Sequence, residues 1–499
     1  MQLSYRKSAF LLIIISLFFR LFWASQLEFG NDEVYYWLYA KYPDISHFDH
    51  PAMVGFFIQF FTANLYFDSE LAIRLAAILP TSIAMYVVFL IGKYLKDDFV
   101  GFISVLLYNI SIYGLIISGT FILPDSPMVL FWLLSFYFLI QVIPYQPKKE
   151  ISLKLFLGFL CIGLAIYSKY QAVYLLFGVV LYVLFYNRKW LKKWQFYLAF
   201  IFPFLAVAII YYWNYQNDFI SYKFHNNRVS FFNLKFNKDS FLREIVGQIV
   251  YNNPYIFVAI FLMIIAFIKK RFLFDKKIVS FFLFFSIPLI ATTIYLSFSR
   301  DTLPHWSGIS YLTLIPLLAV YISSRKNIKR NLIRGFIFLS ILLTFITLEI
   351  NNGWILPVEK SNKKETLGKK DALMDLYGWQ QAAKKVTKVL QENNLTNLPI
   401  ISDKWFPAAH IDYYFARPNN MLVYGVGALH KIHKYYWIHK ENADVNLNEV
   451  LYITDSRNYR KPAEVYGNRF NQFNLIATIP IDRNKETVKY VFIYQLIKD

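Results

Sequence analysis

Two adjacent carboxylates, Asp32 and Glu33, are the residues in this sequence that are best placed to do chemistry. They follow directly on the apolar stretch 8–28, so they lie where a membrane-spanning helix leaves the lipid. Charged groups at that depth are costly unless they are paired or functional. A carboxylate there can act as a general base that takes a proton from an acceptor hydroxyl. The alternative is that both acids only stabilise the N-terminus of a helix over 34–41.

A second polar group follows at Asp49 and His50, just before a proline and the apolar run 52–61. His50 can bind a phosphate oxygen, or it can join Asp49 in a metal site. His305, in the motif LPHW (303–306), is a third residue of suitable type, because histidine and carboxylate side chains suit zinc. A divalent metal ion held by Asp49, His50 and His305 is therefore one candidate cofactor, although no HxxH-type spacing accompanies it.

Three further charged residues lie at the ends of apolar stretches. Asp125, in the motif LPDSP (123–127), is either the N-cap of the next helix or a site residue. Lys169 stands alone at a turn, where we expect an anionic partner, either a lipid headgroup or one of the acids. Arg74 begins another span on the same side. Lys169 and Arg74 are candidates to bind a substrate phosphate; the alternative is that they only extend to the lipid surface.

The elements that must position these residues are membrane-spanning helices. Hydrophobic residues make up 57% of the 499 residues, whereas soluble domains are about 45–50% apolar. The net charge of +20 does not indicate nucleic acid as a partner, because most basic residues lie in short loops between apolar stretches. The single cysteine, Cys161, excludes an intrachain disulfide.

About eleven apolar stretches are candidate spans. They are residues 8–28, 71–92, 99–118, 126–144, 153–168, 170–187, 196–213, 254–268, 278–298, 306–323 and 332–350. Basic residues concentrate in the loops that are cytoplasmic when the N-terminus is cytoplasmic, as the positive-inside rule requires. This topology brings the polar residues to one extracytoplasmic face, namely Asp32, Glu33, Asp49, His50, Asp125, Lys169, Asp301 and His305.

The character of the sequence changes near residue 355, after which no apolar stretch is long enough to span a membrane. An amphipathic helix is predicted over 378–390, and short strands over 398–402, 421–424, 450–454, 475–481 and 490–496. We therefore predict a polytopic α-helical transmembrane domain over 1–354, with a catalytic outer loop at 29–70. A small extracytoplasmic α/β domain is predicted over 355–499, a usual domain size.

A nucleotide-dependent mechanism is disfavoured, because the chain contains neither a GxxxxGK[ST] phosphate loop nor a Rossmann glycine fingerprint. An enzyme on the outer face would instead need a donor that a membrane lipid carries. The motifs that bear on this are NDEVYYW (31–37), HFDHPAMV (47–54), IRLAA (73–77), LPDSPMVLFW (123–132), GLAIYSKYQAV (163–173), YWNYQNDFISYKF (212–224), LPHW (303–306) and LYGW (376–379). This ordered set resembles the GT-C class of glycosyltransferases, in the bacterial branch of the protein O-mannosyltransferase and aminoarabinose transferase superfamily.

The resemblance implies a multi-pass enzyme of the bacterial plasma (inner) membrane. Such an enzyme transfers a sugar, with inversion, from a polyprenyl-phosphate donor to a protein, glycolipid or wall-polymer acceptor. It implies that Asp32 is the general base, Glu33 its companion and Asp125 a second acid that positions acceptor or donor. His50 stands where some relatives carry a lysine that holds the donor phosphate, which shifts that role towards Lys169 and Arg74.

Two other functions compete with this one. A transporter or flippase of lipid-linked sugars would also place charged groups in a membrane protein. Transporters, however, tend to carry internal repeats and binding sites at the midplane, whereas the polar residues here gather at one face and no repeat is visible. A binding or assembly protein, whose outer domain recruits a partner, is the third alternative.

Overall fold

The computed structural model describes residues 4–148, 150–229, 236–325, 328–354, 361, 363–441 and 447–498. The chain forms two compact units. The first, which we call the membrane unit, consists of Met1–Ala24 and Pro43–Ile341. The second, the C-terminal unit, consists of Ser25–Tyr42 and Leu342–Asp499. Residues 355–360, where the sequence predicts the domain boundary, lie outside the described part of the chain.

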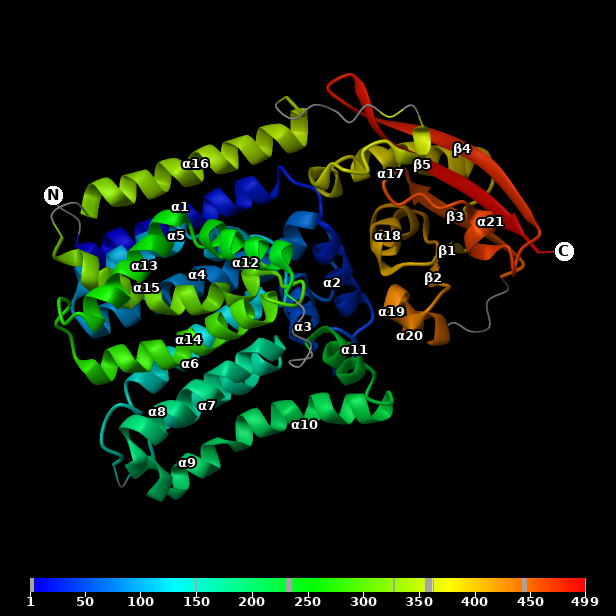
Figure 1. Ribbon diagram of the computed structural model, residues 1–499. Helices are drawn as coiled ribbons and strands as arrows, with labels where there is room; N and C mark the ends of the chain where they lie inside the picture. Colours follow the sequence, from blue (N-terminus) through cyan, green and yellow to red (C-terminus); the bar gives the residue numbers. More distant parts are fainter. Residues whose placement is uncertain are drawn as a thin grey trace. The chain divides into compact units, whose positions relative to one another are not determined.

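The membrane unit is built from helices (Figure 1). Its α-helices are α1 (Tyr5–Ala24), α3 (Met53–Phe61), α4 (Glu70–Leu95), α5 (Asp98–Ile110), α6 (Asp125–Ile140), α7 (Leu153–Ile166), α8 (Val173–Tyr186), α9 (Trp194–Ala199), α10 (Ile201–Gln216), α11 (Ile220–Val229), α12 (Lys238–Tyr251), α13 (Pro254–Ile268), α14 (Lys276–Ser297), α15 (Gly308–Ser323) and the first part of α16 (Ile328–Asn352). The short turns η1 (Tyr113–Ile117), η2 (Tyr170–Ala172), η3 (Arg188–Lys192) and η4 (Pro304–Ser307) connect them.

Six helical segments in the described part of the chain are long and apolar enough to cross a membrane. A seventh results if α12 and α13, which bend by 98° at their junction, form one broken span. Shorter apolar helices over Asp98–Ile110, Asp125–Ile140, Leu153–Ile166 and Tyr170–Tyr186 account for four further predicted spans. The predicted fold class, a polytopic helical membrane protein with a small C-terminal α/β domain, is confirmed.

Capping residues and small residues explain why these helices begin and pack where they do. Ser69 accepts a hydrogen bond from the Ala72 backbone N–H at the start of α4, and the Asp97 carboxylate does the same for Val100 at the start of α5. Where α4 crosses α5, a Cβ placed on Gly92 would lie 2.9 Å from the Cα of Gly101. Paired small residues of this kind let membrane helices approach closely.

The C-terminal unit contains a five-stranded mixed sheet in the order β2-β1-β3-β5-β4. Its strands are β1 (Ile400–Ser402), β2 (Val423–Gly425), β3 (Glu449–Asp455), β4 (Gln472–Arg483) and β5 (Glu486–Ile497). β1 is parallel to β2 and β3, while β5 is antiparallel to β3 and β4. Each predicted strand therefore exists, and the predicted amphipathic helix is α17 (Trp379–Glu392).

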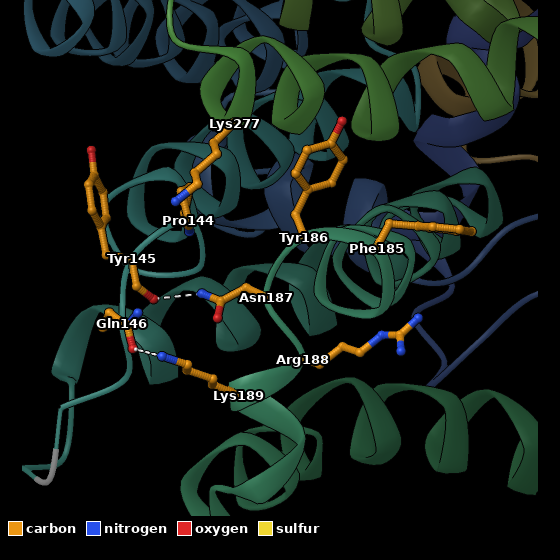
Figure 2. Close-up of a pocket in the computed structure, with 9 residues that line it drawn as sticks. All are labelled: Pro144, Tyr145, Gln146, Phe185, Tyr186, Asn187, Arg188, Lys189 and Lys277. Carbon is orange, nitrogen blue, oxygen red and sulfur yellow. Dashed lines mark hydrogen bonds between the residues drawn. The ribbon is translucent and has the colours of Figure 1, made fainter.

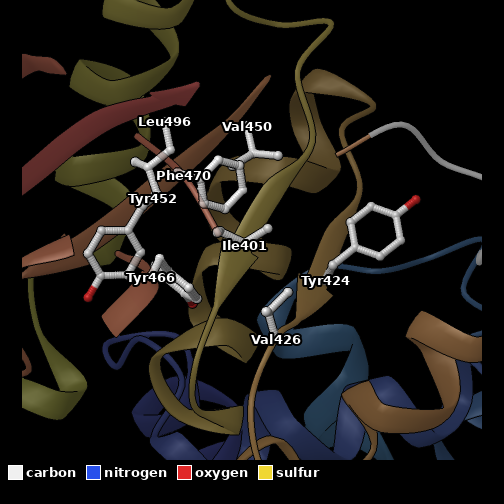
Figure 3. Close-up of a cluster of buried hydrophobic side chains, with 8 residues drawn as sticks. All are labelled: Ile401, Tyr424, Val426, Val450, Tyr452, Tyr466, Phe470 and Leu496. Carbon is white, nitrogen blue, oxygen red and sulfur yellow. The ribbon is translucent and has the colours of Figure 1, made fainter. Parts of the chain in front are cut away.

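The remaining helices of the C-terminal unit are short and follow the strands. Among them are α18 (Trp405–His410), the π-helical turn η7 (Ile411–Ala416), α19 (Leu429–Ile432), α20 (Tyr435–Glu441) and α21 (Pro462–Tyr466), and the 3-10 turns are η5 (Lys364–Thr366), η6 (Ala372–Leu376) and η8 (Arg417–Asn419). Buried apolar and aromatic side chains of β1, β2, β3, β5 and α21 form a core against the sheet (Figure 3). The unit therefore has its own hydrophobic core, as an independent domain requires.

One helix from the N-terminal part of the chain belongs to the C-terminal unit. This helix is α2 (Asn31–Lys41), in which every residue from Glu33 to Ala40 is buried. Its aromatic rings pack on the C-terminal unit, with centroids 5.2 Å apart for Trp37 and Tyr413 and 4.9 Å apart for Tyr35 and Trp405. The predicted outer loop 29–70 is thus divided between the units, because its aromatic first third buries its rings against residues far along the chain.

Candidate active site

A buried ion pair is the central feature of the polar cluster in the membrane unit. The Lys169 ammonium lies 2.6 Å from Oδ2 of Asp125, and the two side chains are only 5% and 2% exposed. The Tyr113 hydroxyl donates a hydrogen bond of 2.8 Å to Oδ1 of the same carboxylate. A buried ion pair contributes little to stability after its desolvation cost. Such a pair is therefore better explained by function than by folding.

The local chain path explains how these groups meet. Asp125 is the first residue of α6 and not its N-cap, since its oxygens bind Lys169 and Tyr113 and no side chain caps this helix. Lys169 lies in the turn between α7 and η2, and its backbone N–H closes the end of α7 on the Ala165 carbonyl. Tyr113, at the start of η1, was missed by sequence reasoning, because nothing distinguishes it from the other tyrosines in apolar stretches.

Two histidines surround this pair. His305 in η4 and His50 in the loop before α3 both lie close enough to interact electrostatically with Lys169 and Asp125. Although part of the His50 surface is accessible, burial of its ring and, second, the nearby Lys169 charge together lower its pKa to about 3. His50 is therefore a neutral ring at physiological pH, able to donate or accept one hydrogen bond at each nitrogen according to tautomer.

Arg74, the third predicted phosphate ligand, makes a different set of contacts. It is fully buried near the start of α4, and its Nη1 donates a hydrogen bond of 2.8 Å to the carbonyl of Ala24, the last residue of α1. Its guanidinium lies 5.8 Å from the centroid of the Phe121 ring. These contacts satisfy a carbonyl that a helix end leaves without an intrahelical partner.

The structure does not assemble the divalent-ion site that the sequence left open at Asp49, His50 and His305. Among the residues that the structure describes, no three His, Cys, Asp or Glu side chains are spaced to hold a metal ion. The Asp49 carbonyl lies 3.0 Å from Nε2 of His225. The positive charge of the Lys169 ammonium acts on the rings of both His50 and His305. A metal ion bound by these two rings would be repelled by the same charge.

In the C-terminal unit, Asp32 and Glu33 face different environments. Glu33 is 2% exposed, and its Oε2 accepts a hydrogen bond of 3.1 Å from the backbone N–H of Gly30, the N-cap of α2. This reciprocal contact is half of a capping box. Asp32, one position earlier in the first turn, is exposed. The pair is thus divided into a buried helix cap and an accessible carboxylate.

The segment that carries Asp32 is held at its N-terminal end by three contacts. The Glu28 carboxylate accepts hydrogen bonds from the backbone N–H groups of Trp379 (2.6 Å) and Gln380 (3.1 Å) at the start of α17. An anion at a helix N-terminus is favoured by the helix dipole. The Phe29 backbone N–H donates to the Tyr414 hydroxyl at 2.9 Å. These contacts fix the residues that enter α2.

Two ring and amide contacts continue this anchorage. Oδ1 of Asn31 lies 3.0 Å from Nε2 of His410, whose ring stacks on Trp379 at 4.1 Å between centroids. Burial lowers the pKa of His410 well below its ordinary value, so the ring is neutral at physiological pH. Asn31, the residue next to Asp32, is therefore held by an imidazole that stays uncharged at physiological pH.

A salt bridge holds the other end of α2. The Lys41 ammonium lies 2.9 Å from Oδ1 of Asp412 in η7, and the Tyr435 hydroxyl donates to Oδ2 at 3.2 Å. Burial alone would lower the pKa of Lys41, but the Asp412 carboxylate raises it above its ordinary value. The helix that carries Asp32 is thus fixed at both ends within the C-terminal unit.

Comparisons with known proteins agree with this architecture. The family model described as dolichyl-phosphate-mannose-protein mannosyltransferase matches residues 49–213. This range includes His50, Arg74, Asp125 and Lys169. A comparison with curated protein sequences finds no match. The family match covers a third of the chain, and together with the fold it supports the GT-C class that the motifs predicted.

Among the solved structures that the chain is similar to are two of ArnT from Cupriavidus metallidurans. The ArnT structure bound to undecaprenyl phosphate superposes with a TM-score of 0.60, and the apo structure with 0.57. In both cases the identity is 11%, and the match covers 97% of this chain and 97% of that chain. An apo oligosaccharyltransferase from Archaeoglobus fulgidus gives a weaker likeness, with a TM-score of 0.47, 13% identity and coverage of 91% and 69% of the two chains.

Proposed function

We propose that this chain transfers a sugar, with inversion, from a polyprenyl-phosphate donor to an acceptor on the extracytoplasmic face of the bacterial inner membrane. The observation that carries the proposal is the buried Asp125–Lys169 pair, a cation held ready at the predicted outer end of a membrane helix. The ArnT structure with undecaprenyl phosphate supports a lipid phosphate as the ligand class. The N-terminus is proposed to be cytoplasmic.

The Lys169 ammonium is the proposed contact for the donor phosphate. Asp125 accepts one hydrogen bond from this ammonium, which has three N–H groups, so two are available for phosphate oxygens. Asp125 positions this ammonium, and the neutral His50 ring can add a further hydrogen bond. A cation aimed at the leaving phosphate stabilises the charge that develops in the transition state. Nη1 of Arg74 donates a hydrogen bond to the Ala24 carbonyl at the end of α1. We therefore propose that Arg74 adds positive electrostatic potential to the site and does not bind the phosphate directly.

Asp32 is the proposed general base. It takes the proton of the acceptor as the acceptor atom bonds to the anomeric carbon. The bond from that carbon to the phosphate oxygen breaks, and its electron pair stays on the phosphate. A single displacement inverts the anomeric configuration. Glu33 supports this step indirectly, because its carboxylate caps the helix on which Asp32 stands.

The test is an Asp32→Asn substitution, which keeps the shape of the side chain and removes its basicity. Loss of a general base typically costs 10²–10⁴-fold in rate. Cells that carry only this variant are expected to accumulate the polyprenyl-phosphate sugar and to lose the modified acceptor, both measured by mass spectrometry. Glu392→Gln, at an exposed acid in the same unit, is the matched control.

Two results would contradict the proposal. Normal transfer by the Asp32→Asn variant at normal protein levels would remove the base assignment. Movement of the lipid-linked sugar across vesicle membranes by the wild-type protein, without any turnover of the donor, would favour the transporter alternative instead.

A further inference from the structure

A second charged site lies in the membrane unit, at the other end of the helices that carry the Asp125–Lys169 pair. It is a cleft of about 480 Å³ between the loop after α6, the C-terminal end of α8 with η3, and the N-terminal end of α14 (Figure 2). α6 has 16 residues and α8 has 14, so the cleft and the ion pair are separated by roughly 21–24 Å of helix. The cleft is therefore distinct from the proposed donor site.

Hydrogen bonds hold the walls of the cleft in place. The Asn187 side-chain amide donates to the carbonyls of Ile143 (2.8 Å) and Tyr145 (2.7 Å), which fixes the loop after α6. The Lys189 ammonium, in η3, donates to Oε1 of Gln146 on the same loop at 2.8 Å. Figure 2 shows the bonds from Asn187 to Tyr145 and from Lys189 to Gln146, which reach from the chain after α8 to the facing loop. The site is thus formed before any ligand binds.

The charge of the cleft is positive. Arg188, Lys189 and Lys277 line it, and no acid is among its lining residues. In the described part of the chain none of these three side chains forms an ion pair with a carboxylate. The carboxylate nearest in sequence, Asp275, caps α14 by accepting from the Lys277 backbone N–H at 2.8 Å. Nε of Arg188 donates to the Leu184 carbonyl, which leaves both terminal nitrogens for another acceptor.

The rim of the cleft is apolar and aromatic. Phe185, at the C-terminal end of α8, is 68% exposed. Tyr145, in the loop after α6, is 49% exposed. An exposed phenylalanine beside an arginine at a span terminus matches an amphiphilic ligand, with a charged head and an apolar body. Basic pockets between membrane helices on the cytoplasmic side are sites for anionic lipid headgroups.

We propose that this cleft binds the phosphodiester headgroup of an anionic phospholipid in the leaflet opposite to the proposed active site. Arg188 and Lys277 contact the phosphate oxygens, Lys189 adds to the positive field while it braces Gln146, and one acyl chain runs along Phe185. The ligand class is an anionic glycerophospholipid, and the role is independent of the sugar-transfer chemistry.

The experiment is native mass spectrometry of the full-length protein in detergent, with phosphatidylglycerol as the probe. Phosphatidylcholine, which is zwitterionic, and soluble glycerol 3-phosphate, which carries the anion without acyl chains, are run in parallel. The test variant is Arg188→Gln/Lys277→Gln. The matched control is Lys192→Gln/Lys276→Gln, which removes two exposed charges of the same loops that do not line the cleft.

The wild type and the control are expected to retain phosphatidylglycerol in preference to phosphatidylcholine. The test variant is expected to bind phosphatidylglycerol roughly 25-fold more weakly, since each basic residue near a membrane surface contributes about fivefold in affinity. Equal retention of phosphatidylcholine, unchanged binding by the test variant, or binding of glycerol 3-phosphate as tight as that of the lipid would each overturn the proposal.

Discussion

The buried Asp125–Lys169 pair permits an experiment that separates its contribution to stability from its contribution to catalysis. In Lys169→Met the Asp125 carboxylate, 2% exposed, loses its counter-ion and keeps the hydrogen bond from the Tyr113 hydroxyl. Removing one member of a buried ion pair typically costs about 3–5 kcal/mol, because the remaining charge is left buried. We expect the thermal unfolding midpoint of the purified protein to fall accordingly.

The second variant in this experiment is Lys169→Met/Asp125→Leu, which replaces both charges by apolar side chains of similar size. Replacing a whole buried pair by well-packed apolar residues is often neutral or stabilising. The double variant should therefore recover the midpoint that the single variant loses. If Lys169 holds the donor phosphate, the double variant should still be inactive, and the donor lipid should accumulate in cells.

Scanning calorimetry or fluorescence at one fixed scan rate measures stability in detergent, and mass spectrometry of the donor lipid measures turnover. Lys169→Arg keeps the charge and is the control for the position. A double variant that transfers sugar normally would refute the phosphate role of Lys169. A double variant as unstable as Lys169→Met would refute the reasoning that an unpaired Asp125 carboxylate causes the loss.

Two further predictions concern the histidines. The pKa of His50 is about 3 in the folded protein and about 6.5 in an unfolded chain, so the unfolded state binds more protons between these values. Stability should therefore fall as the pH is lowered through this range, and His50→Gln should show a smaller fall in unfolding midpoint between pH 6.5 and pH 4 than the wild type does. His410→Ala removes the hydrogen bond to Asn31 and the stack on Trp379. Amide hydrogen exchange in α2 should therefore become faster than in the wild type, whereas Glu392→Gln should leave it unchanged. Equal protection of α2 in both variants would contradict the anchoring role of His410.

The polar cluster in the membrane unit could be predicted, because the membrane topology determines which helix ends lie on the same side. Apolar stretches and basic loops set the direction of each helix, and direction alone places Asp125, Lys169 and His305 at the same end of their helices. The structure brings them together, and it adds Tyr113, which lies within an apolar stretch and carries no sequence signal. A shared face does not determine distances, and among the described residues no three His, Cys, Asp or Glu side chains are spaced to hold a metal ion.

The placement of α2 could not be predicted, because its contacts join residues very distant in sequence. Glu28 and Trp379 are separated by 351 positions, and no periodicity in either segment indicates the other. The division between Asp32 and Glu33 was hidden for a related reason. A capping box is usually signalled by Ser or Thr three positions before the acid, and here that position is Gly30, which offers only its backbone.

The membership of Ser25–Tyr42 in the C-terminal unit has a consequence for biosynthesis. The chain leaves the membrane unit after α1, returns at Pro43, and supplies the rest of the C-terminal unit only from Leu342 onwards. At about 5–20 residues per second, the ribosome needs on the order of 15–60 s to make the intervening 300 or so residues. During this interval the aromatic face of α2 has no native docking partner. A nascent chain at this stage should be a client for chaperones outside the membrane, and a protein truncated before residue 342 should leave this face permanently uncovered.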